Sequence, residues 1–290
     1  MATVRDKGYH HWDGRLEELR FPWWPVTRNG IRLSFQRKYF KFLVAFSYLP
    51  AFFFLAGIYI SERLEDFRFM VRGSETFLAI DPKYFNTYFT ADFVLFMLIM
   101  ILVFAGAGLI ADDMKHNALQ LYFSRPLRKR DYLFGKAAVV FFFVLALTFV
   151  PGMILLFMKL VFSGSFALLV QYPWLPLSIV ACSVLYAVVF ASYTLLLSAL
   201  SRNRRYVTIL IFAVYLFSDI LFGIFYGTFR NPHFGLLSLK ANLQQAGAAI
   251  FGQSTPFAFP WLLSLLVLAG LCIVAVAVLS RRVREVEIVR

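Results

Sequence analysis

Hydrophobic positions gather along this chain into six long runs, and polar residues gather in the short segments between them. A helix needs about 20 apolar residues to cross the roughly 30 Å hydrocarbon core of a bilayer. The runs are close to that length or longer and cover residues 42–60, 93–111, 137–158, 175–200, 206–229 and 261–280. The pattern therefore predicts an all-α integral membrane protein with six transmembrane helices, whose membrane domain extends over residues 42–280.

The segment before the first run has apolar residues at three- and four-residue spacing among basic ones. These apolar residues are Ile31, Phe35, Tyr39 and Phe42. The spacing predicts an amphipathic helix over residues 29–41 that lies in the membrane interface and leads into the first span. Upstream, Pro22 and Pro25 stand too close together for a regular helix, so we expect the stretch FPWWPV to be irregular. Residues 1–41 are thus predicted to form a cytoplasmic segment with one interfacial helix.

Two other connecting segments are longer than simple hairpins. Residues 61–90 carry charges of both signs, which predicts a loop on the outer side of the membrane. Residues 236–250 have the composition of a helix but are too short to cross the bilayer. They suit a re-entrant helix before the sixth span, which protein would have to cover, or a helix on the outer surface. The sequence leaves both alternatives open.

Two of the runs contain residues that are unusual inside a membrane. Pro151 and Gly152 predict a kink in the third run, which is tolerable where a neighbouring group covers the freed carbonyl. Asp219 lies in the middle of the fifth run, and a carboxylate at such depth usually faces a partner or a cavity. Asp219 could contact a substrate or a cation. It could equally make a structural hydrogen bond at an interface between subunits, or mark a span that ends earlier.

Composition and charge agree with a membrane protein. Hydrophobic residues make up 60% of the 290 residues and charged residues 16%, whereas about a quarter of a soluble domain is charged. The net charge of +13 is concentrated in short loops, where basic residues orient helices and meet anionic lipid. We therefore expect the lipid bilayer as a partner and no nucleic acid.

The distribution of Lys and Arg predicts the orientation. With the N-terminus inside, the inner segments hold 22 of the 29 Lys and Arg residues. These inner segments are 1–41, 112–136, 201–205 and 281–290. Such an excess over short loops indicates the cytoplasmic side. Both termini, including the tail 281–290, are predicted to be cytoplasmic.

The segment 112–136, between the second and third runs, has the most informative order of residues. Asp112 and Asp113 end the second run, and a short apolar patch follows at Leu119, Leu121, Tyr122 and Phe123. Ser124, Arg125 and Pro126 turn the chain, and Arg128, Arg130 and Asp131 lead into the third run. An apolar patch with a charged rim is the composition of a docking element. It also suits an interfacial loop whose basic side chains reach the headgroups.

The sequence AGAGLIADD, followed by NALQLYFSRPLRKRDYLFGK, resembles the membrane subunits of the ABC-2 family of ATP-driven transporters. The resemblance lies in Ser124–Arg125–Pro126, in Arg128 and Arg130, in Asp131–Tyr132 and in Gly135–Lys136. The six-span layout and the interfacial helix are also similar. The chain departs from the family at two places. It has Asp112 and Asp113 where the family often has Glu, and it has Asn117–Ala118 where the family often has Gly-Thr.

This resemblance implies a short cytoplasmic coupling helix between spans two and three that binds in a groove of a separate ABC ATPase. It implies two copies of that ATPase and a second permease, identical or homologous, in the cytoplasmic (inner) membrane of a prokaryote, and usually export. The implied contact residues are Asp112, Asp113, Leu119, Leu121, Tyr122, Phe123, Ser124, Arg125, Pro126, Arg128, Arg130 and Asp131. The interfacial helix would flank the same ATPase.

The chain lacks a nucleotide-binding motif of its own. Gly135–Lys136 has neither the upstream glycine nor the following Ser or Thr of a GxxxxGK[ST] loop. We therefore expect a transport subunit that is not an enzyme and binds no cofactor, with ATP and Mg on the partner. Cys182 and Cys272 predict neither a disulfide nor a metal site. The competing hypotheses are a membrane scaffold or sensor that recruits a soluble partner, and an ion-coupled carrier that uses Asp219.

Overall fold

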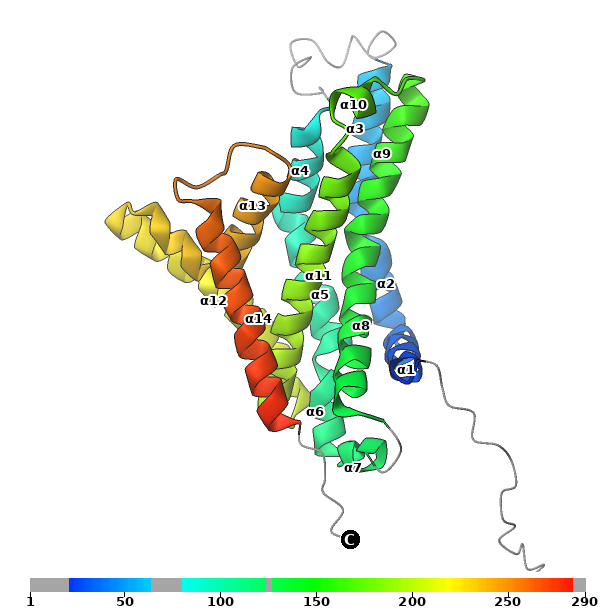
Figure 1. The fold of residues 1–290 in the computed structure, drawn as a ribbon, viewed down its shortest axis with the longest axis vertical. Coiled ribbons are helices and arrows are strands. Elements are labelled where there is room, and N and C mark those ends of the chain that lie inside the picture. The colour runs from blue at the N-terminus through cyan, green and yellow to red at the C-terminus, as the bar shows by residue number, and fades with distance from the viewer. Residues whose placement is uncertain (1–20, 64–79, 124–126, 284–290) are drawn as a thin grey trace, which may run out of the picture.

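The computed structural model describes residues 21–63, 80–123 and 127–283. Six helical segments are long and apolar enough to cross a membrane, which confirms the predicted all-α membrane fold. They are Lys38–Glu62, Asp92–Lys115, Lys129–Ser163, Leu175–Leu200, Arg204–Phe229 and Trp261–Arg282. They form an elongated bundle from which the fifth segment leans outward (Figure 1).

The first three of these segments are each divided into two helices by a local break. The helices are α2 (Lys38–Ser47) and α3 (Leu49–Glu62), α5 (Asp92–Gly106) and α6 (Gly108–Lys115), and α8 (Lys129–Leu147) and α9 (Phe149–Ser163). The other three are the continuous helices α11 (Leu175–Leu200), α12 (Arg204–Phe229) and α14 (Trp261–Arg282). The break at Thr148 lies three residues before Pro151, where the sequence predicts a kink.

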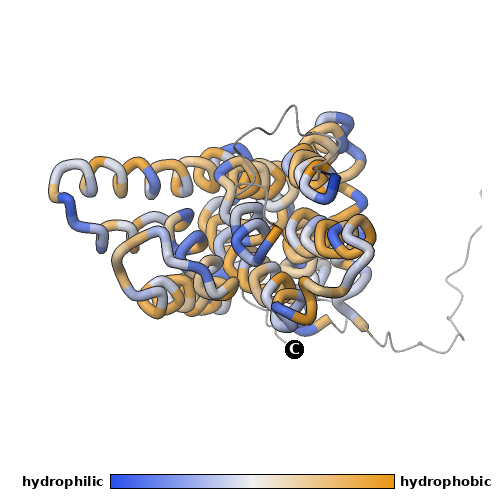
Figure 2. Tube along the Cα trace, turned by 90° about the horizontal axis from the view of Figure 1, so that it is seen from above, coloured by the Kyte–Doolittle hydropathy of each residue, from blue (hydrophilic) through white to orange (hydrophobic). Residues whose placement is uncertain are grey.

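Burial divides the spans into a central and a peripheral group. The second, third and fourth segments are mostly buried by the rest of the protein, whereas the first, fifth and sixth are mostly exposed. Seen from above, apolar residues continue around the outside of the bundle (Figure 2). The exposed spans therefore present surfaces that suit lipid or another membrane subunit.

The N-terminal helix begins earlier than the sequence analysis predicts. Helix α1 extends over Trp23–Phe35, so the expectation of an irregular FPWWPV stretch was wrong. Pro22 is the N-cap and Pro25 lies in the first turn, where backbone N–H groups have no helical partner to lose. The helix ends at Phe35, with Gln36 as its C-cap, and the first span already begins at Lys38.

Close backbone contact holds α1 against the base of α8. The Thr27 hydroxyl donates to the Gly135 carbonyl at 2.9 Å. A Cβ added at Gly135 would lie 2.9 Å from the Trp23 carbonyl oxygen, and one at Gly30 would lie 2.6 Å from Val139. The two glycines therefore allow α1 to approach α8 more closely than larger residues would.

Part of the predicted outer loop is a helix. Residues 64–79 lie outside the described ranges, but Pro82–Thr90 forms α4, which directly precedes α5. The Asp81 side chain caps it by accepting a hydrogen bond from the Tyr84 amide at 3.1 Å. Phe85, Tyr88 and Phe89 bury its inner face. The sequence analysis also missed α10 (Ala167–Gln171) and the 3-10 helix η2 (Pro232–Leu237).

The short helix before the sixth span lies inside the protein. Helix α13 (Leu239–Ile250) packs against α14, α4, α12 and α11, and most of its residues are buried (Figure 1). The Gln245 side chain donates to the carbonyls of Phe257 and Phe259, at 3.0 and 2.6 Å, and accepts from the Phe257 amide. Protein therefore covers both the helix and the following backbone, as a re-entrant segment requires.

Candidate coupling site

A six-residue helix occupies the end of the molecule that the charge distribution predicts to be cytoplasmic. This helix, α7 (Ala118–Phe123), follows α6 and lies beyond the ends of α6 and α8 (Figure 1). The chain reverses between α6 and α7 at Asn117, which has a φ of 53°. Asn tolerates this left-handed conformation better than most residues that carry a side chain. The predicted short helix between spans two and three is therefore present.

A buried charge cluster connects α6 to α8 beside α7. The Asp113 carboxylate accepts a hydrogen bond from the Tyr132 hydroxyl at 2.6 Å, and the Lys136 ammonium lies 2.6 Å from the same oxygen. The side chains of Asp113 and Lys136 are only 15% and 10% exposed. Because a buried charge is costly unless it is paired, each of these groups holds the other in place.

Aromatic contacts attach α7 to this cluster. The rings of Tyr122 and Tyr132 lie 5.3 Å apart, centre to centre. The Lys136 ammonium lies 5.8 Å from the centre of the Tyr122 ring and 5.4 Å from that of Tyr132. A cation at such distances is attracted to the ring face. Burial, and then the Asp113 charge, raise the pKa of Tyr122, so its hydroxyl remains neutral at physiological pH.

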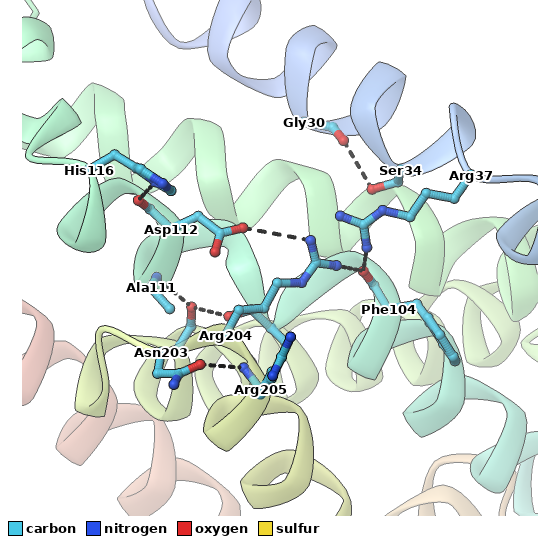
Figure 3. A network of polar contacts seen from close by, with 12 residues as sticks. Gly30, Ser34, Arg37, Phe104, Ala111, Asp112, His116, Asn203, Arg204 and Arg205 are labelled. Carbon is cyan, nitrogen blue, oxygen red and sulfur yellow. Dashed lines mark hydrogen bonds and ion pairs between the residues drawn. The ribbon is translucent and has the colours of Figure 1, made fainter.

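A second polar network surrounds the break between α5 and α6. The Phe104 carbonyl accepts hydrogen bonds from Arg204, at 2.9 Å, and from Arg37, at 3.3 Å (Figure 3). Arg204 also lies 3.6 Å from the Asp112 carboxylate. These contacts join the beginnings of α2 and α12 to the second span.

Ser198 of α11 bridges the same break from the other side. Its hydroxyl accepts from the amides of Ile110 and Ala111, at 3.0 and 3.2 Å, and donates to the Ala107 carbonyl at 2.9 Å. An unpaired buried backbone group would be costly, so Ser198 stabilises the broken conformation. The helix that leads to α7 is therefore fixed to the central span α11.

The predicted contact residues differ in how far the structure describes them and in how exposed they are. Asp112 and Asp113 project from α6, Leu119 and Tyr122 are half-buried on α7, and Asp131 lies in the first turn of α8. Arg128 and Arg130 are exposed. Leu121 and Phe123 belong to α7, but their side chains are not described; Ser124, Arg125 and Pro126 lie outside the described residues.

Sequence reasoning missed the residues that hold this segment in position. Lys136 appears in the family-like motif, but no spacing rule connects it to Asp113 across an intervening loop. Arg37, Ser198 and Arg204 come from other elements, and only the tertiary structure brings them to the α5–α6 break. The basic segments around Arg37 and Arg204 indicated the cytoplasmic side, not these contacts.

Asp219 belongs to a separate cluster near α13. Its carboxylate lies 2.9 Å from the Lys240 ammonium and accepts a hydrogen bond from Ser238 at 3.0 Å. Lys240 also lies 3.3 Å from Asp92, at the start of α5. Burial opposes the charge of Lys240, but Asp219 and Asp92 outweigh it and raise the pKa of this ammonium. Asp219 thus has a cationic partner in the same chain.

Comparison with known proteins agrees with the resemblance of the 112–136 segment. The model of the family described as ABC-2 family transporter protein matches residues 37–282, which include all six spans, α7 and α13. No curated protein matches the chain. The match and the six-span fold identify a multi-pass membrane permease, which is a transport subunit of an ABC transporter. The chain therefore belongs to the ABC-2 family of transporter proteins.

Proposed function

We propose that this protein is the membrane permease of an ATP-driven exporter and that a separate ABC ATPase docks on residues 112–132, with α7 at the centre of the contact. The ATPase binds ATP and Mg, and this chain binds no cofactor. Family membership supports this assignment, because ABC transporters draw their energy from such ATPases.

The observation that carries the proposal is the buried cluster of Asp113, Tyr132 and Lys136. A docking element can transmit a movement only if it is rigidly attached to the helices that must move. The cluster attaches α7 to both α6 and α8 through a charge pair, a hydrogen bond and ring contacts. A displacement of α7 by the ATPase therefore shifts the second and third spans together.

The exposed residues around α7 suit a protein partner. Lys115, Gln120, Arg128 and Arg130 are exposed at this end of the molecule, while Tyr122 faces the interior cluster. Polar and basic groups at the rim leave the ATPase free to supply acidic groups around a central apolar contact. Helix α1 lies against α8 at the same end and would flank the partner (Figure 1).

The complete transporter contains two permeases and two ATPases in this proposal. The exposed surfaces of the first, fifth and sixth spans offer room for a second permease, identical or homologous. The excess of Lys and Arg in the segments around α7 supports a cytoplasmic position for both termini. We assign the protein to the cytoplasmic membrane of a prokaryote, with substrate moving outward.

Replacement of Leu121, Tyr122 and Phe123 by Ser tests the docking site. The permease is co-expressed with a candidate partner ABC ATPase, and the complex is purified through a tag on the permease. We expect the variant to insert into the membrane but to lose the ATPase and its stimulated turnover. A control triple replaces Phe166, Val170 and Leu177 by Ser.

The control residues are exposed apolar side chains near α10, at the opposite end of the bundle from α7 (Figure 1). Because Tyr122 supports the buried cluster, the charge reversals Arg128→Glu and Arg130→Glu provide a second test that leaves the cluster intact. We expect these to weaken ATPase binding as well. Unchanged ATPase recovery and turnover in both α7-region variants would exclude docking at this segment.

A further inference from the structure

Three helix junctions lie at one level of the bundle. They are the junction of α2 and α3 at Tyr48, that of α4 and α5 at Ala91, and that of α8 and α9 at Thr148. The Tyr48 hydroxyl donates to the Ala146 carbonyl, in the last turn of α8, at 2.8 Å. The Tyr88 hydroxyl, three residues before Ala91, donates to the next carbonyl, that of Leu147, at 2.9 Å. These two hydrogen bonds bring the three junctions together.

Local chemistry explains each of the three breaks. Pro50 lies in the first turn of α3 and Pro151 in the first turn of α9. A proline has no N–H for the carbonyl four residues before it, and its ring clashes with that carbonyl, so helices kink there. At the third junction, Ala91 has an extended ψ of 129°, which separates α4 from α5. Three chain segments therefore lose helical hydrogen bonds at the same level.

The three helices beyond the junctions bind one another. Helices α3, α4 and α9, which we call the distal lobe, lie on the side of the junctions away from α7 (Figure 1). Lys159 of α9 forms an ion pair with Glu62 of α3, and the two side chains are only 15% and 17% exposed. The Tyr84 hydroxyl of α4 donates to the Phe54 carbonyl of α3. Polar contacts thus join α3 to both of the other helices in the lobe.

The distal lobe packs against the continuous helix α11. A Cβ added at Gly152 of α9 would lie 3.1 Å from the Phe89 ring of α4 and 2.9 Å from the Ile179 side chain of α11. Helix α11 passes this level without a break. Apolar contacts of this kind allow packed helices to slide, whereas α11 keeps its own shape and supports the lobe.

Hydrogen bonds from neighbouring helices meet the last turn of α4. The Tyr186 hydroxyl of α11 donates to the Phe89 carbonyl at 3.3 Å. The Gln244 side chain of α13 donates to the Thr90 carbonyl at 2.8 Å. Both carbonyls lie within one turn of Ala91. These contacts fix the place where the lobe is attached, and they leave its far end free to move along α11.

We propose that the distal lobe turns as one body about the level of the three junctions and that the hydroxyls of Tyr48 and Tyr88 set its resting position. Helix α9 ends at Ser163, 15 residues beyond Thr148 or about 22 Å, so a turn of roughly 10° moves its end by about 4 Å. Because α4 packs against α13, the same turn changes the packing of α13 at the end of the bundle opposite α7.

The hinge is separate from the coupling site. Thr148 follows Tyr132 by 16 residues, which is about 24 Å along α8. Every contact that forms the hinge lies within one chain. The turn of the lobe can therefore be measured on the permease without an ATPase, and a second permease bound to the exposed spans would leave these contacts in place.

Spin labels on the full-length protein follow the lobe. Cys182 and Cys272 are replaced by Ala, and labelled protein is mixed with an excess of unlabelled protein, so that double electron–electron resonance measures distances within one chain. Labels at Val161 of α9 and Val184 of α11 report the distance across the hinge. Labels at Val161 and at Phe53 of α3 report a distance within the lobe. The side chains at these three positions are exposed.

Tyr88→Phe removes one hydroxyl from the hinge and keeps the ring. We expect the distance across the hinge to shift or broaden by roughly 4 Å, as a turn of about 10° requires, and the distance within the lobe to stay the same. Tyr193→Phe is the matched control. The Tyr193 hydroxyl also donates to a carbonyl, that of Ile211, but it joins α11 to α12. Its removal should change neither distance.

Two further variants keep the test decisive if Tyr88→Phe folds poorly. Tyr48→Phe removes a hydroxyl from a half-buried residue and should also broaden the distance across the hinge. Pro151→Ala restores an N–H towards the Leu147 carbonyl and should narrow that distance again in either background. An unchanged distance across the hinge in both tyrosine variants would overturn the proposal. Equal broadening within the lobe, or the same broadening in Tyr193→Phe, would show general loosening in place of a hinge and would overturn it as well.

Discussion

The Tyr88 hydroxyl of α4 donates a hydrogen bond to the Leu147 carbonyl of α8 at 2.9 Å. Leu147 stands four residues before Pro151, which has no N–H to offer that carbonyl. The kink between α8 and α9 therefore leaves an acceptor inside the bundle, and a side chain from another element satisfies it. The sequence predicted the kink and the need for such a neighbour, but it did not identify Tyr88.

Tyr88→Phe should destabilise the protein, because it leaves the buried Leu147 carbonyl without a partner. Such a loss costs about 1–3 kcal/mol. The thermal midpoint of the purified protein, measured by intrinsic fluorescence, should fall. Pro151→Ala restores an N–H at the fourth residue after Leu147, so Tyr88→Phe should cost less in that background. Equal losses in both backgrounds would contradict this account of the kink.

The pair of Asp113 and Lys136 supports a second prediction. Asp113→Asn should leave the Lys136 ammonium buried without a counter-charge, at a cost of about 3–5 kcal/mol. We expect a lower thermal midpoint and, in the complex, a reduced stimulation of the ATPase. Both follow from the loss of the attachment between α6 and α8.

A double-mutant cycle separates this pair from general damage to the loop. Asp113→Asn/Lys136→Met removes both charges and should be more stable than the sum of the single variants predicts. Lys115→Met provides the control, because Lys115 is an exposed cation of α6, the helix that carries Asp113. If Lys115→Met were as harmful as Lys136→Met, the buried pair would not be what holds α7 in place.

The small residues before Asp112 provide a third prediction. A Cβ on Gly106 would clash with the Thr194 methyl group of α11. Gly106→Ala should therefore force α5 and α11 apart, and overpacking of this kind costs about 1–3 kcal/mol. We expect a lower thermal midpoint and a partial rescue by Thr194→Ser, which removes the methyl group and keeps the hydroxyl.

Gly223 supplies the matched control for this substitution. It lies within α12, and an added Cβ would meet nothing within 4 Å. Gly223→Ala should be neutral or stabilising, because Ala is the better helix former by about 1 kcal/mol. A similar loss in Gly223→Ala and Gly106→Ala would show that close helix packing is not the reason for Gly106.

The sequence predicts those features that depend on local composition. The length of the apolar runs was enough to predict the six spans, and the order of residues around Pro126 was enough to predict the family. The predicted start of the N-terminal helix was wrong because the two prolines were judged by their close spacing and not by their position at the N-cap and in the first turn. Helix α4 was missed because its polar residues resembled those of a loop, while its apolar face is buried only by distant spans.

In the candidate site, too, local sequence predicted some features and only the packing of distant segments determined others. Asp112 and Asp113 were identified from their place at the end of a span, which is local information. Their partners Arg204 and Lys136 follow 92 and 23 residues later, respectively, and meet them only once the helices have packed. A periodic pattern within one segment cannot predict such a contact between two segments.

The cluster of Asp219 and Lys240 supports a fourth prediction, on transport. A proton- or sodium-coupled carrier needs a carboxylate that releases and takes up its ion, whereas Asp219 has a fixed ammonium at 2.9 Å. We therefore expect Asp219→Asn to retain ATP-dependent transport, measured in proteoliposomes with the partner ATPase once a substrate is known. Loss of transport with normal folding and ATPase activity would favour the ion-coupled hypothesis.

The fifth prediction concerns the pH dependence of this cluster. Asp219 and Asp92 raise the pKa of Lys240 above its ordinary value of 10.5, against the opposing effect of burial. A raised pKa in the folded state means that the ion pairs stabilise the protein fully below pH 10.5 and lose this effect as the pH rises through the higher, folded-state value. Thermal midpoints of the wild type and Lys240→Met should therefore differ by a constant amount from pH 6 to 9 and converge only in more alkaline solution. A difference that already changes between pH 6 and 9 would contradict this account of the ion pairs.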